Sequence, residues 1–235
     1  MRSLWFGILA CAAMLVACGD DDSDFSTRPS DGSSSSRAKS SSSAKSSDSV
    51  VGCKTEKEDN CEYSELADDR DGQTYKTVKI GGQWWMAQNL NYETDSSFCY
   101  KDSVEFCEKY GRLYTWDAVV DVCPDGWHLP SKAEWETLIT AVGGQATAGK
   151  MLKSTSGGKG SDAFGFSALP AGYRVKGGGY LYAGAHTFFR SSTVSSTEIN
   201  NGPYSAFLDF NADYAAGMSS DDYNNYGFSV RCLKD

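Results

Sequence analysis

One short stretch of the sequence collects residue types that could do chemistry. Cys123–Leu138, which reads CPDGWHLPSKAEWETL, contains a cysteine, one of the two histidines of the chain, two tryptophans and two glutamates. A histidine near a glutamate can serve in general acid–base catalysis. A cysteine can act as a nucleophile, as a metal ligand or as half of a disulfide.

The cysteine content favours disulfides. After Cys18 the chain has six cysteines, an even number typical of an exported disulfide-bonded protein, although six cysteines allow fifteen pairings. The spacing indicates two local bonds and leaves one that closes about 110 residues. These pairs are Cys53–Cys61, Cys99–Cys107 and Cys123–Cys232. The alternative is a zinc site, but the chain has no C-x-x-C pair and its two histidines lie far apart, so we expect no metal centre.

Two helices are predicted around the opening stretch. In the first, Thr115 caps a helix that delivers Cys123. In the second, Ser131 stands three residues before Glu134 in a capping box, and a Gly-Gly pair at 143–144 ends the helix. The apolar faces consist of Trp116, Val119 and Val120 in the first helix and of Trp135, Leu138, Ile139 and Val142 in the second.

The reactive residues of the stretch thus have structural uses. Glu134 closes the cap, Trp135 enters the core and Glu136 lies on the outer side of the helix. His128 has no visible partner in the sequence, which favours a satisfied or half-exposed histidine over a catalytic base.

Short strands are expected before and after these helices. Residues 71–92 alternate in polarity around Gly81-Gly82 and predict a hairpin. Beyond residue 152 glycine, serine, asparagine and tyrosine dominate, and no long helical period occurs. Strands are predicted within 164–184, with a glycine-rich loop at 177–179, and at 188–193, 206–211 and 228–232. No Lys-Ser pair or helix follows the glycine loop, so it is not a phosphate-binding loop.

The N-terminal residues predict an envelope location. Residues 1–17 have a basic start and an apolar run too short to span a bilayer, and Leu15-Val16-Ala17-Cys18 resembles a bacterial lipobox with Cys18 as the lipidated residue. Residues 18–52 are acidic and then serine-rich, and predict a disordered tether that spans roughly 30 Å. We expect a lipoprotein anchored by its lipid in the outer membrane and facing outward, with a small disulfide-closed segment at 53–67.

The net charge and the tyrosine content restrict the classes of binding partner that we expect. A net charge of −9 argues against nucleic acid, which requires a basic face. Tyrosines can stack on sugar rings, while amide, imidazole and guanidinium groups donate hydrogen bonds, although any one of these residues can equally belong to the core. The candidate ligand-binding residues are Tyr180, Tyr182, His186, Arg190, Tyr223 and Asn224, with further tyrosines at Tyr173, Tyr204, Tyr214 and Tyr226.

Six segments together resemble the Fibrobacter succinogenes major paralogous domain. They follow one another over residues 68–235 and read DGQTYKTVKIG, QWWMAQNLNY, CEKYGRLYTW, CPDGWHLPSKAEW, FGFSALPAGYR and YGFSVRCLKD. This family has no established biochemical activity and occurs mostly in exported proteins and lipoproteins. The resemblance therefore agrees with the predicted anchor.

A more distant similarity concerns the fold. WDAVVDVC and GWHLPSKAEWETL resemble a helix and a corner of the formylglycine-generating-enzyme group, which shares the C-type lectin-like fold. The similarity implies an α+β fold with two helices, short antiparallel sheets, long loops and disulfides. In lectins of that fold a cysteine of the first helix pairs with one in the last strand, as Cys123 and Cys232 would. The late pair of reactive cysteines of the enzymes and the Glu-Pro-Asn and Trp-Asn-Asp motifs of the calcium-dependent lectins are absent.

Three functions compete on this basis. The first is a non-catalytic surface module for adhesion or binding, with plant polysaccharide as the ligand. The second is a structural or protein-interaction domain of the cell envelope. The third is an enzyme of the formylglycine-generating or hydrolase type, but no spacing joins its candidate residues His128, His186, Glu134 and Asp209. We expect the first function, with no enzymatic activity and no cofactor.

Overall fold

The computed structural model describes residues 50–157, 160–196, 202–213, 215–220 and 224–235. These residues form an α+β domain that contains antiparallel sheets, α-helices and three disulfides. Within these ranges no helix has the length and apolar character needed to cross a membrane.

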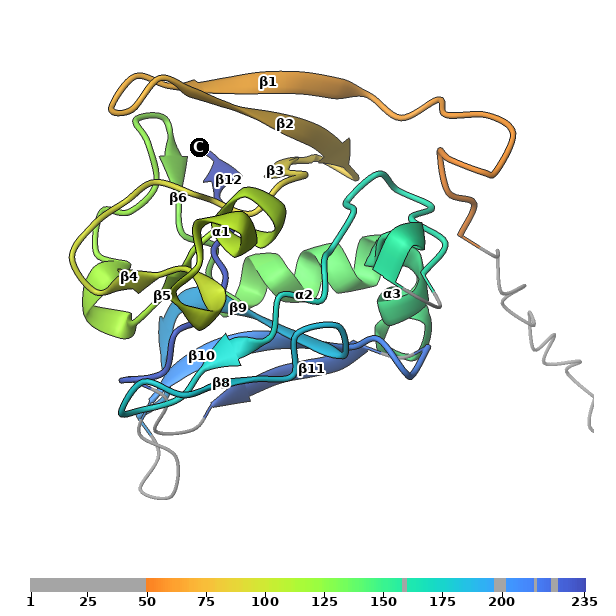
Figure 1. Ribbon diagram of the computed structural model, residues 1–235. Coiled ribbons are helices and arrows are strands. Elements are labelled where there is room, and N and C mark those ends of the chain that lie inside the picture. The colour runs from red at the N-terminus through yellow and green to blue at the C-terminus, as the bar shows by residue number, and fades with distance from the viewer. Residues whose placement is uncertain (1–49, 158–159, 197–201, 214, 221–223) are drawn as a thin grey trace, which may run out of the picture. The chain divides into compact units, whose positions relative to one another are not determined.

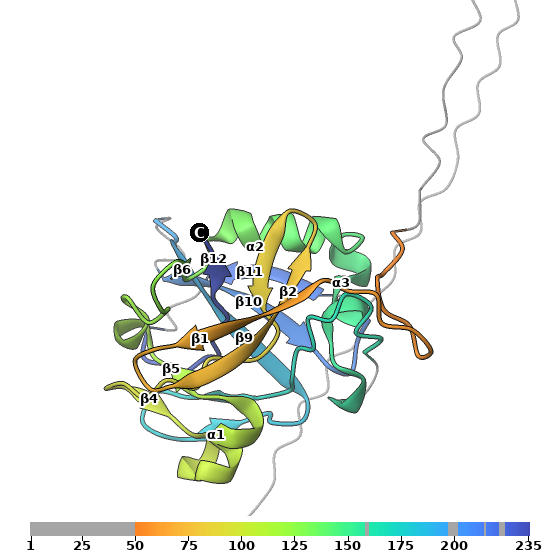
Figure 2. The ribbon, with the colours of Figure 1, turned by 90° about the horizontal axis from the view of Figure 1, so that it is seen from above.

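The largest sheet has five antiparallel strands in the order β1-β2-β3-β12-β6. The polarity of β2 explains its orientation, because Tyr75 and Ile80 are buried while Lys76 and Lys79 are exposed. The predicted Gly-Gly turn joins β2 to β3, and Gly81 adopts a φ of 59° there. The strands are β1 (Tyr63–Asp68), β2 (Gln73–Ile80), β3 (Gln83–Met86), β6 (Trp127–His128) and β12 (Leu233–Lys234). β1 and β2 run side by side in Figures 1 and 2.

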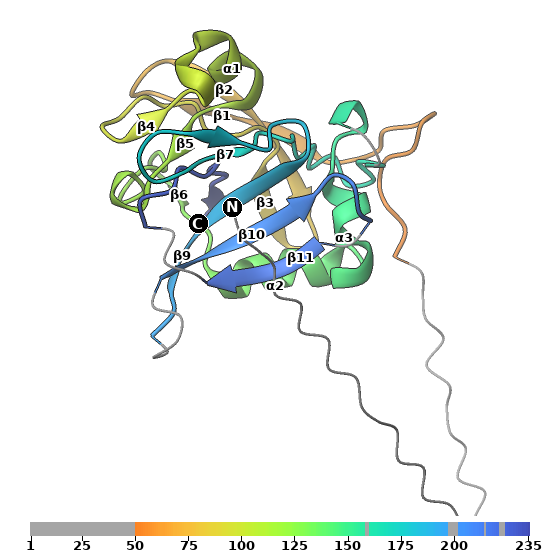
Figure 3. The ribbon, with the colours of Figure 1, turned by 60° about the horizontal axis from the view of Figure 1, so that its bottom comes forward.

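A second sheet has three antiparallel strands in the order β11-β10-β9, which lie side by side in Figure 3. Its two faces differ, because side chains alternate along a strand. Phe189 and Leu208 are buried on one face, whereas Phe188 and Phe207 pair across the strands and are half-buried on the other. The strands are β9 (His186–Val194), β10 (Pro203–Asp209) and β11 (Ala215–Ser220).

Shorter elements connect the two larger sheets. β4 pairs with β5, and β7 pairs with β8 across the predicted glycine-rich loop. These strands are β4 (Ser97–Phe98), β5 (Leu113–Tyr114), β7 (Tyr173–Arg174) and β8 (Tyr180–Leu181). The 3₁₀ turns are η1 (Tyr100–Asp102), η2 (Trp116–Ala118) and η3 (Thr155–Gly157).

The helices are α1 (Val104–Tyr110), α2 (Lys132–Ala141) and α3 (Gln145–Leu152). The predicted capping box starts α2: the Glu134 amide donates to Ser131 Oγ at 3.3 Å, and the Ser131 amide donates to Glu134 Oε2 at 2.7 Å. Gly143, with a φ of 103°, follows the end of the helix, as the Gly-Gly pair predicts.

Helix α2 lies between the two larger sheets (Figure 1). Its Trp135 ring centroid is 4.8 Å from that of Trp85 in β3 and 5.4 Å from that of Phe189 in β9. The Trp135 indole also donates to the Arg190 carbonyl at 3.2 Å. One side chain therefore joins the helix to both sheets, and the main core surrounds it.

Arg231 is a fully buried cation next to this core. Its Nε donates to Asn89 Oδ1 at 2.8 Å and its Nη2 to the Ser167 carbonyl at 3.0 Å. Its Nη1 donates to the carbonyls of Met86 and Phe166. Burial lowers the pKa of the guanidinium to about 9.

The three disulfides join the pairs that the spacing predicts: Cys53–Cys61, Cys99–Cys107 and Cys123–Cys232. The first closes a small loop ahead of β1. Lys54 attaches this loop to the domain, because its Nζ lies 2.6 Å from Asp162 Oδ2 and its amide donates to the Ala163 carbonyl at 3.0 Å.

Three details differ from the expectation. Instead of a helix after Thr115 only the turn η2 forms, the Thr115 side chain caps nothing, and Val120 is 71% exposed. The left-handed conformation of Asp121 (φ 56°), followed by Pro124, prevents a longer helix. The described residues contain three α-helices rather than two, and the last strand covers Leu233–Lys234 rather than 228–232. The C-type lectin-like assignment stays an interpretation of the sequence.

The disulfides differ in the chain length that they close, which leads to a stability prediction. Residues 123 and 232 are 109 apart, against 8 for residues 53 and 61. Loop entropy predicts ~4.7 kcal/mol for the long bridge and ~2.5 kcal/mol for the short one. We expect a Cys123→Ala/Cys232→Ala double variant to lose more free energy of unfolding in urea than the matched Cys53→Ala/Cys61→Ala variant. Equal losses would contradict this ranking.

Candidate functional site

Six aromatic side chains form one continuous surface on the side of the β9–β10 sheet that faces away from α2. His186 and Phe188 of β9 lie on the same side of the sheet because they stand two residues apart. Phe207 of β10 is the cross-strand partner of Phe188 and lies on that side too. The other three belong to β7, to the residue after β8 and to the segment before the C-terminal strand. The aromatic surface consists of Tyr173, Tyr182, His186, Phe188, Phe207 and Tyr226.

The rings contact one another in sequence. Tyr182 stacks on His186 with the centroids 4.6 Å apart and on Tyr173 at 5.8 Å. Tyr173 in turn lies 6.1 Å from Tyr226, and the Phe188 and Phe207 centroids are 4.6 Å apart. These distances are those of favourable aromatic pairs, so the rings support one another in a fixed arrangement.

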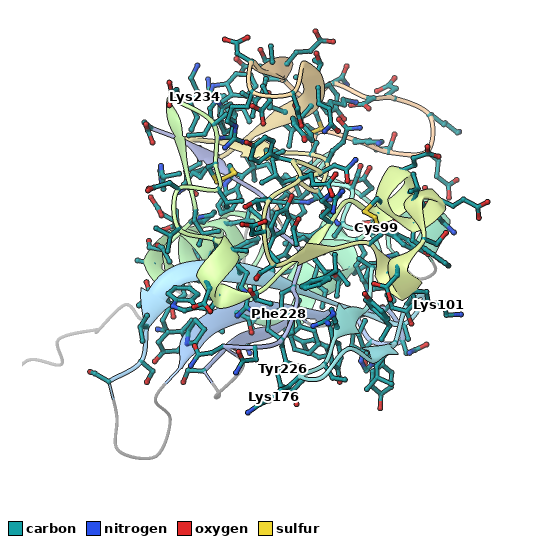
Figure 4. The ribbon with its side chains drawn as sticks, turned by 60° about the vertical axis from the view of Figure 1, so that its left-hand side comes forward. Cys99, Lys101, Lys176, Tyr226, Phe228 and Lys234 are labelled. Carbon is teal, nitrogen blue, oxygen red and sulfur yellow. A yellow bond between two sulfur atoms is a disulfide. The ribbon has the colours of Figure 1, made fainter. Side chains whose placement is uncertain are left out.

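The surface is accessible although its base is buried. Tyr182 is 51% exposed, whereas Phe228 below the surface is 1% exposed and stacks on Phe188 at 4.9 Å. Figure 4 shows Tyr226 and Phe228 close together, with Lys176 of the β7–β8 loop at the lower margin. Partial burial, with the neighbouring tyrosines, raises the pKa of Tyr173.

The backbone holds Tyr182 in an uncommon conformation. Its φ is 62°, which a bulky residue rarely adopts, and its carbonyl accepts from the amides of Ala185 and His186 at 3.0 Å. Gly172, with a φ of 67°, allows the hairpin to approach, because a Cβ there would lie 2.4 Å from the Leu181 carbonyl. The strained residue is also the most exposed ring of the surface.

Polar groups adjoin the aromatic rings. His186 Nε2 lies 3.7 Å from Asp209 Oδ1, and these residues are cross-strand partners. Asn224 is half-buried, and its carbonyl accepts from the Trp116 amide at 2.9 Å. Tyr180 lies outside the surface, because its hydroxyl hydrogen-bonds to Asp102 and its ring contacts Tyr100 at 5.2 Å.

Arg190 does not belong to the accessible surface, contrary to the sequence-based expectation. Its side chain is fully buried, and burial lowers its pKa to about 9. Its Nε donates to the Tyr114 carbonyl at 3.2 Å and its Nη2 to the Tyr226 carbonyl, while its guanidinium lies 4.5 Å from the centre of the Phe228 ring. Arg190 thus supports Tyr226 from inside rather than contacting a ligand.

The structure does not describe all of the predicted site residues, and the sequence analysis missed two residues of the aromatic surface. Cys18, Tyr214 and Tyr223 lie outside the described residues. Phe188 and Phe207 were not among the candidates, although the alternation in HTFFRSST indicates that His186 and Phe188 share a face. Where the structure is described, no group of three or more His, Cys, Asp or Glu residues could hold a metal ion.

Comparison with known proteins identifies the family of the domain. The family model described as the Fibrobacter succinogenes major domain matches residues 78–234. The chain belongs to this family. No curated protein and no solved structure matches the chain. Within the major domain, the match includes the whole aromatic surface and the long disulfide.

The major domain also contains a histidine held between two carboxylates. His128 Nδ1 lies 2.6 Å from Asp235 Oδ1, and its Nε2 lies 3.0 Å from Glu134 Oε1. The sequence did not reveal these partners, one of which is 107 residues away, but His128 is satisfied and half-exposed, as expected. The pair of contacts ties the C-terminal strand to the cap of α2.

The carboxylates also set the charge of this histidine. Partial burial lowers the pKa of His128, but the hydrogen bonds and negative charges of Asp235 and Glu134 outweigh it and raise the pKa. The pKa of Glu134 is lowered: burial opposes this shift, and the hydrogen bonds from Ser131 and His128 produce it.

The raised pKa predicts a pH-dependent contribution of His128 to stability. The imidazolium stabilises the folded state fully below about pH 6.5, and this contribution is lost as the pH rises through the raised folded pKa. We expect His128→Gln to reduce the free energy of unfolding more in mildly acidic than in alkaline buffer, measured by urea denaturation. Asp235→Asn should diminish this pH dependence, and a loss for His128→Gln that is the same at every pH would contradict the prediction.

Proposed function

We propose that the major domain is a non-catalytic binding module that recognises polysaccharide through the aromatic surface. The observation that carries the proposal is the continuous, partly exposed set of six rings on one face. Sugar rings present apolar C–H faces and polar hydroxyl edges. Exposed tyrosine rings suit both, because they combine an apolar face with a hydroxyl group.

The arrangement of the reactive groups supports a binding role rather than catalysis. All six cysteines of the described domain are in disulfides, so none of them is a thiol that could act as an oxidase nucleophile. Both ring nitrogens of His128 are engaged by carboxylates. His186 faces Asp209, and its ring is stacked on Tyr182, which suits a contact residue on a binding surface.

The location that we propose is the outer membrane, with the domain facing outward. The lipobox-like Leu15–Cys18 and the serine-rich residues that follow support it, and a polysaccharide outside the cell would be within reach of such a domain. We also propose the C-type lectin-like fold, supported by the Cys123–Cys232 bond between the segment after η2 and the end of the chain.

The aromatic surface predicts a loss of glycan binding on removal of Tyr182. We expect the wild-type domain to be retained on insoluble plant polysaccharide, and Tyr182→Asn to bind at least tenfold more weakly, ~1.4 kcal/mol. Asparagine is chosen because it tolerates positive φ. The readout is the bound fraction in a pull-down on cellulose and hemicellulose.

The matched control for this experiment is Tyr204→Asn. Tyr204 is a half-buried tyrosine of the same sheet, but its ring lies 5.4 Å from Lys132 Nζ of α2 and outside the aromatic surface. Binding should be unchanged in this variant. A correctly folded wild-type domain that is retained on no glycan would refute the proposed function.

The proposed anchor predicts the cellular distribution of the protein. With Cys18→Ser the thiol that takes the lipid is absent, so we expect the protein to move from the membrane fraction to the soluble fraction of cells. Cys11→Ser, which leaves the lipidated position intact, serves as the control and should remain with the membranes. Retention of Cys18→Ser in the membrane fraction would exclude the lipid anchor.

A further inference from the structure

A groove of about 730 Å³ lies outside the aromatic surface, between η2, the turn at 124–126 and β6. This volume is within the usual range of small-molecule sites, about 300–1,000 Å³. Its walls include two tryptophans and two aspartates. We call it the tryptophan groove and define it by Trp116, Trp127, Asp121 and Asp125.

The four defining side chains are available to a ligand. Trp116 and Trp127 are half-buried, and Asp121 and Asp125 are exposed. Throughout the described part of the chain, no side chain or backbone group hydrogen-bonds to either indole N–H or to either carboxylate. The backbone fixes the tryptophans, because the Trp116 amide donates to the Asn224 carbonyl at 2.9 Å and the Trp127 amide donates to the Pro124 carbonyl at 3.0 Å.

The cations that line the groove are already neutralised. Arg70 donates two hydrogen bonds to the Asp68 carboxylate, at 2.8 and 2.7 Å. His128 lies between Asp235 and Glu134. The unpaired charges of the groove are therefore the two aspartates, and the groove should disfavour anionic ligands.

We propose that the tryptophan groove is a second sugar-binding site and that its ligand is an uncharged polysaccharide; this inference rests on the proposed function. A sugar hydroxyl both donates and accepts, so it can donate to Asp121 or Asp125 and accept from an indole N–H. An ammonium group only donates and would leave both indole N–H groups unpaired. The indole faces of Trp116 and Trp127 supply the apolar contact for a sugar ring.

The position of the groove indicates an extended polymer rather than a single sugar. Ser192 of β9 lines the groove, and it shares its face of the strand with Phe188 and His186 of the aromatic surface. Ser192 stands six positions after His186, which is about 20 Å along a strand. Residues 224–226 connect the two sites, since Asn224 contacts Trp116 and Tyr226 belongs to the aromatic surface. Only a chain of several sugar units can occupy both sites together.

The experiment measures binding of short and long cello-oligosaccharides to the folded domain by calorimetry. We expect long oligosaccharides to bind more tightly than short ones, because the second contact becomes intramolecular. Trp127→Ala and Tyr182→Asn should each lower the affinity for the long oligosaccharide about tenfold. Asp121→Asn/Asp125→Ala should weaken it too; asparagine is used at residue 121 because it tolerates the positive φ there. Thermal melting checks the folding of each variant.

The outcomes separate the two proposals. If the groove variants bind like wild type while Tyr182→Asn is impaired, the groove inference is wrong and the proposed function stands. If only the groove variants are impaired, the groove is the sugar site and the aromatic surface is not. If the folded wild-type domain binds no oligosaccharide, both the groove inference and the proposed function are wrong. Binding of a Lys-Trp-Lys peptide or of oligogalacturonides in place of the neutral sugars would also overturn the proposed ligand class.

Discussion

The buried guanidinium of Arg231 is the interaction on which the rest of the domain depends. It binds the carbonyls of Met86, Phe166 and Ser167, so the segments around residues 86 and 166 meet the C-terminal segment at one side chain. A buried cation without such partners would cost several kcal/mol. Because main-chain oxygens supply most of its hydrogen bonds, the segments must keep their relative positions for the charge to remain satisfied.

The same guanidinium borders the aromatic core. It lies 4.3 Å from the centre of the Phe166 ring and 5.3 Å from that of Phe189, and both rings contact Trp135 of α2. Phe189 belongs to β9, whose opposite face carries Phe188 and His186. The packing of the core therefore fixes the strand that presents the aromatic surface. A change at Trp135 would therefore alter the aromatic surface although Trp135 does not belong to it.

Local patterns in the sequence predicted local structure well. The capping box at Ser131, the Gly-Gly turns and the three disulfide pairs all occur in the structure. The predictions failed where the deciding contact is distant in sequence. His128 is engaged by Asp235, 107 residues away, and Arg190 is buried under Tyr226. The prediction of a helix after Thr115 failed for a different reason. The left-handed conformation of Asp121, followed by Pro124, prevents the helix that the apolar pattern predicts.

The small loop closed by Cys53–Cys61 has a mechanical consequence. A pull on the chain at residue 50 reaches the Lys54–Asp162 ion pair and the bond from the Lys54 amide to the Ala163 carbonyl before it reaches β1. The disulfide keeps the loop between Cys53 and Cys61 from extending under this load. The force thus acts on the interior at residues 162–163, next to Phe166 and Arg231. It does not pull directly on β1, the edge strand of the five-stranded sheet.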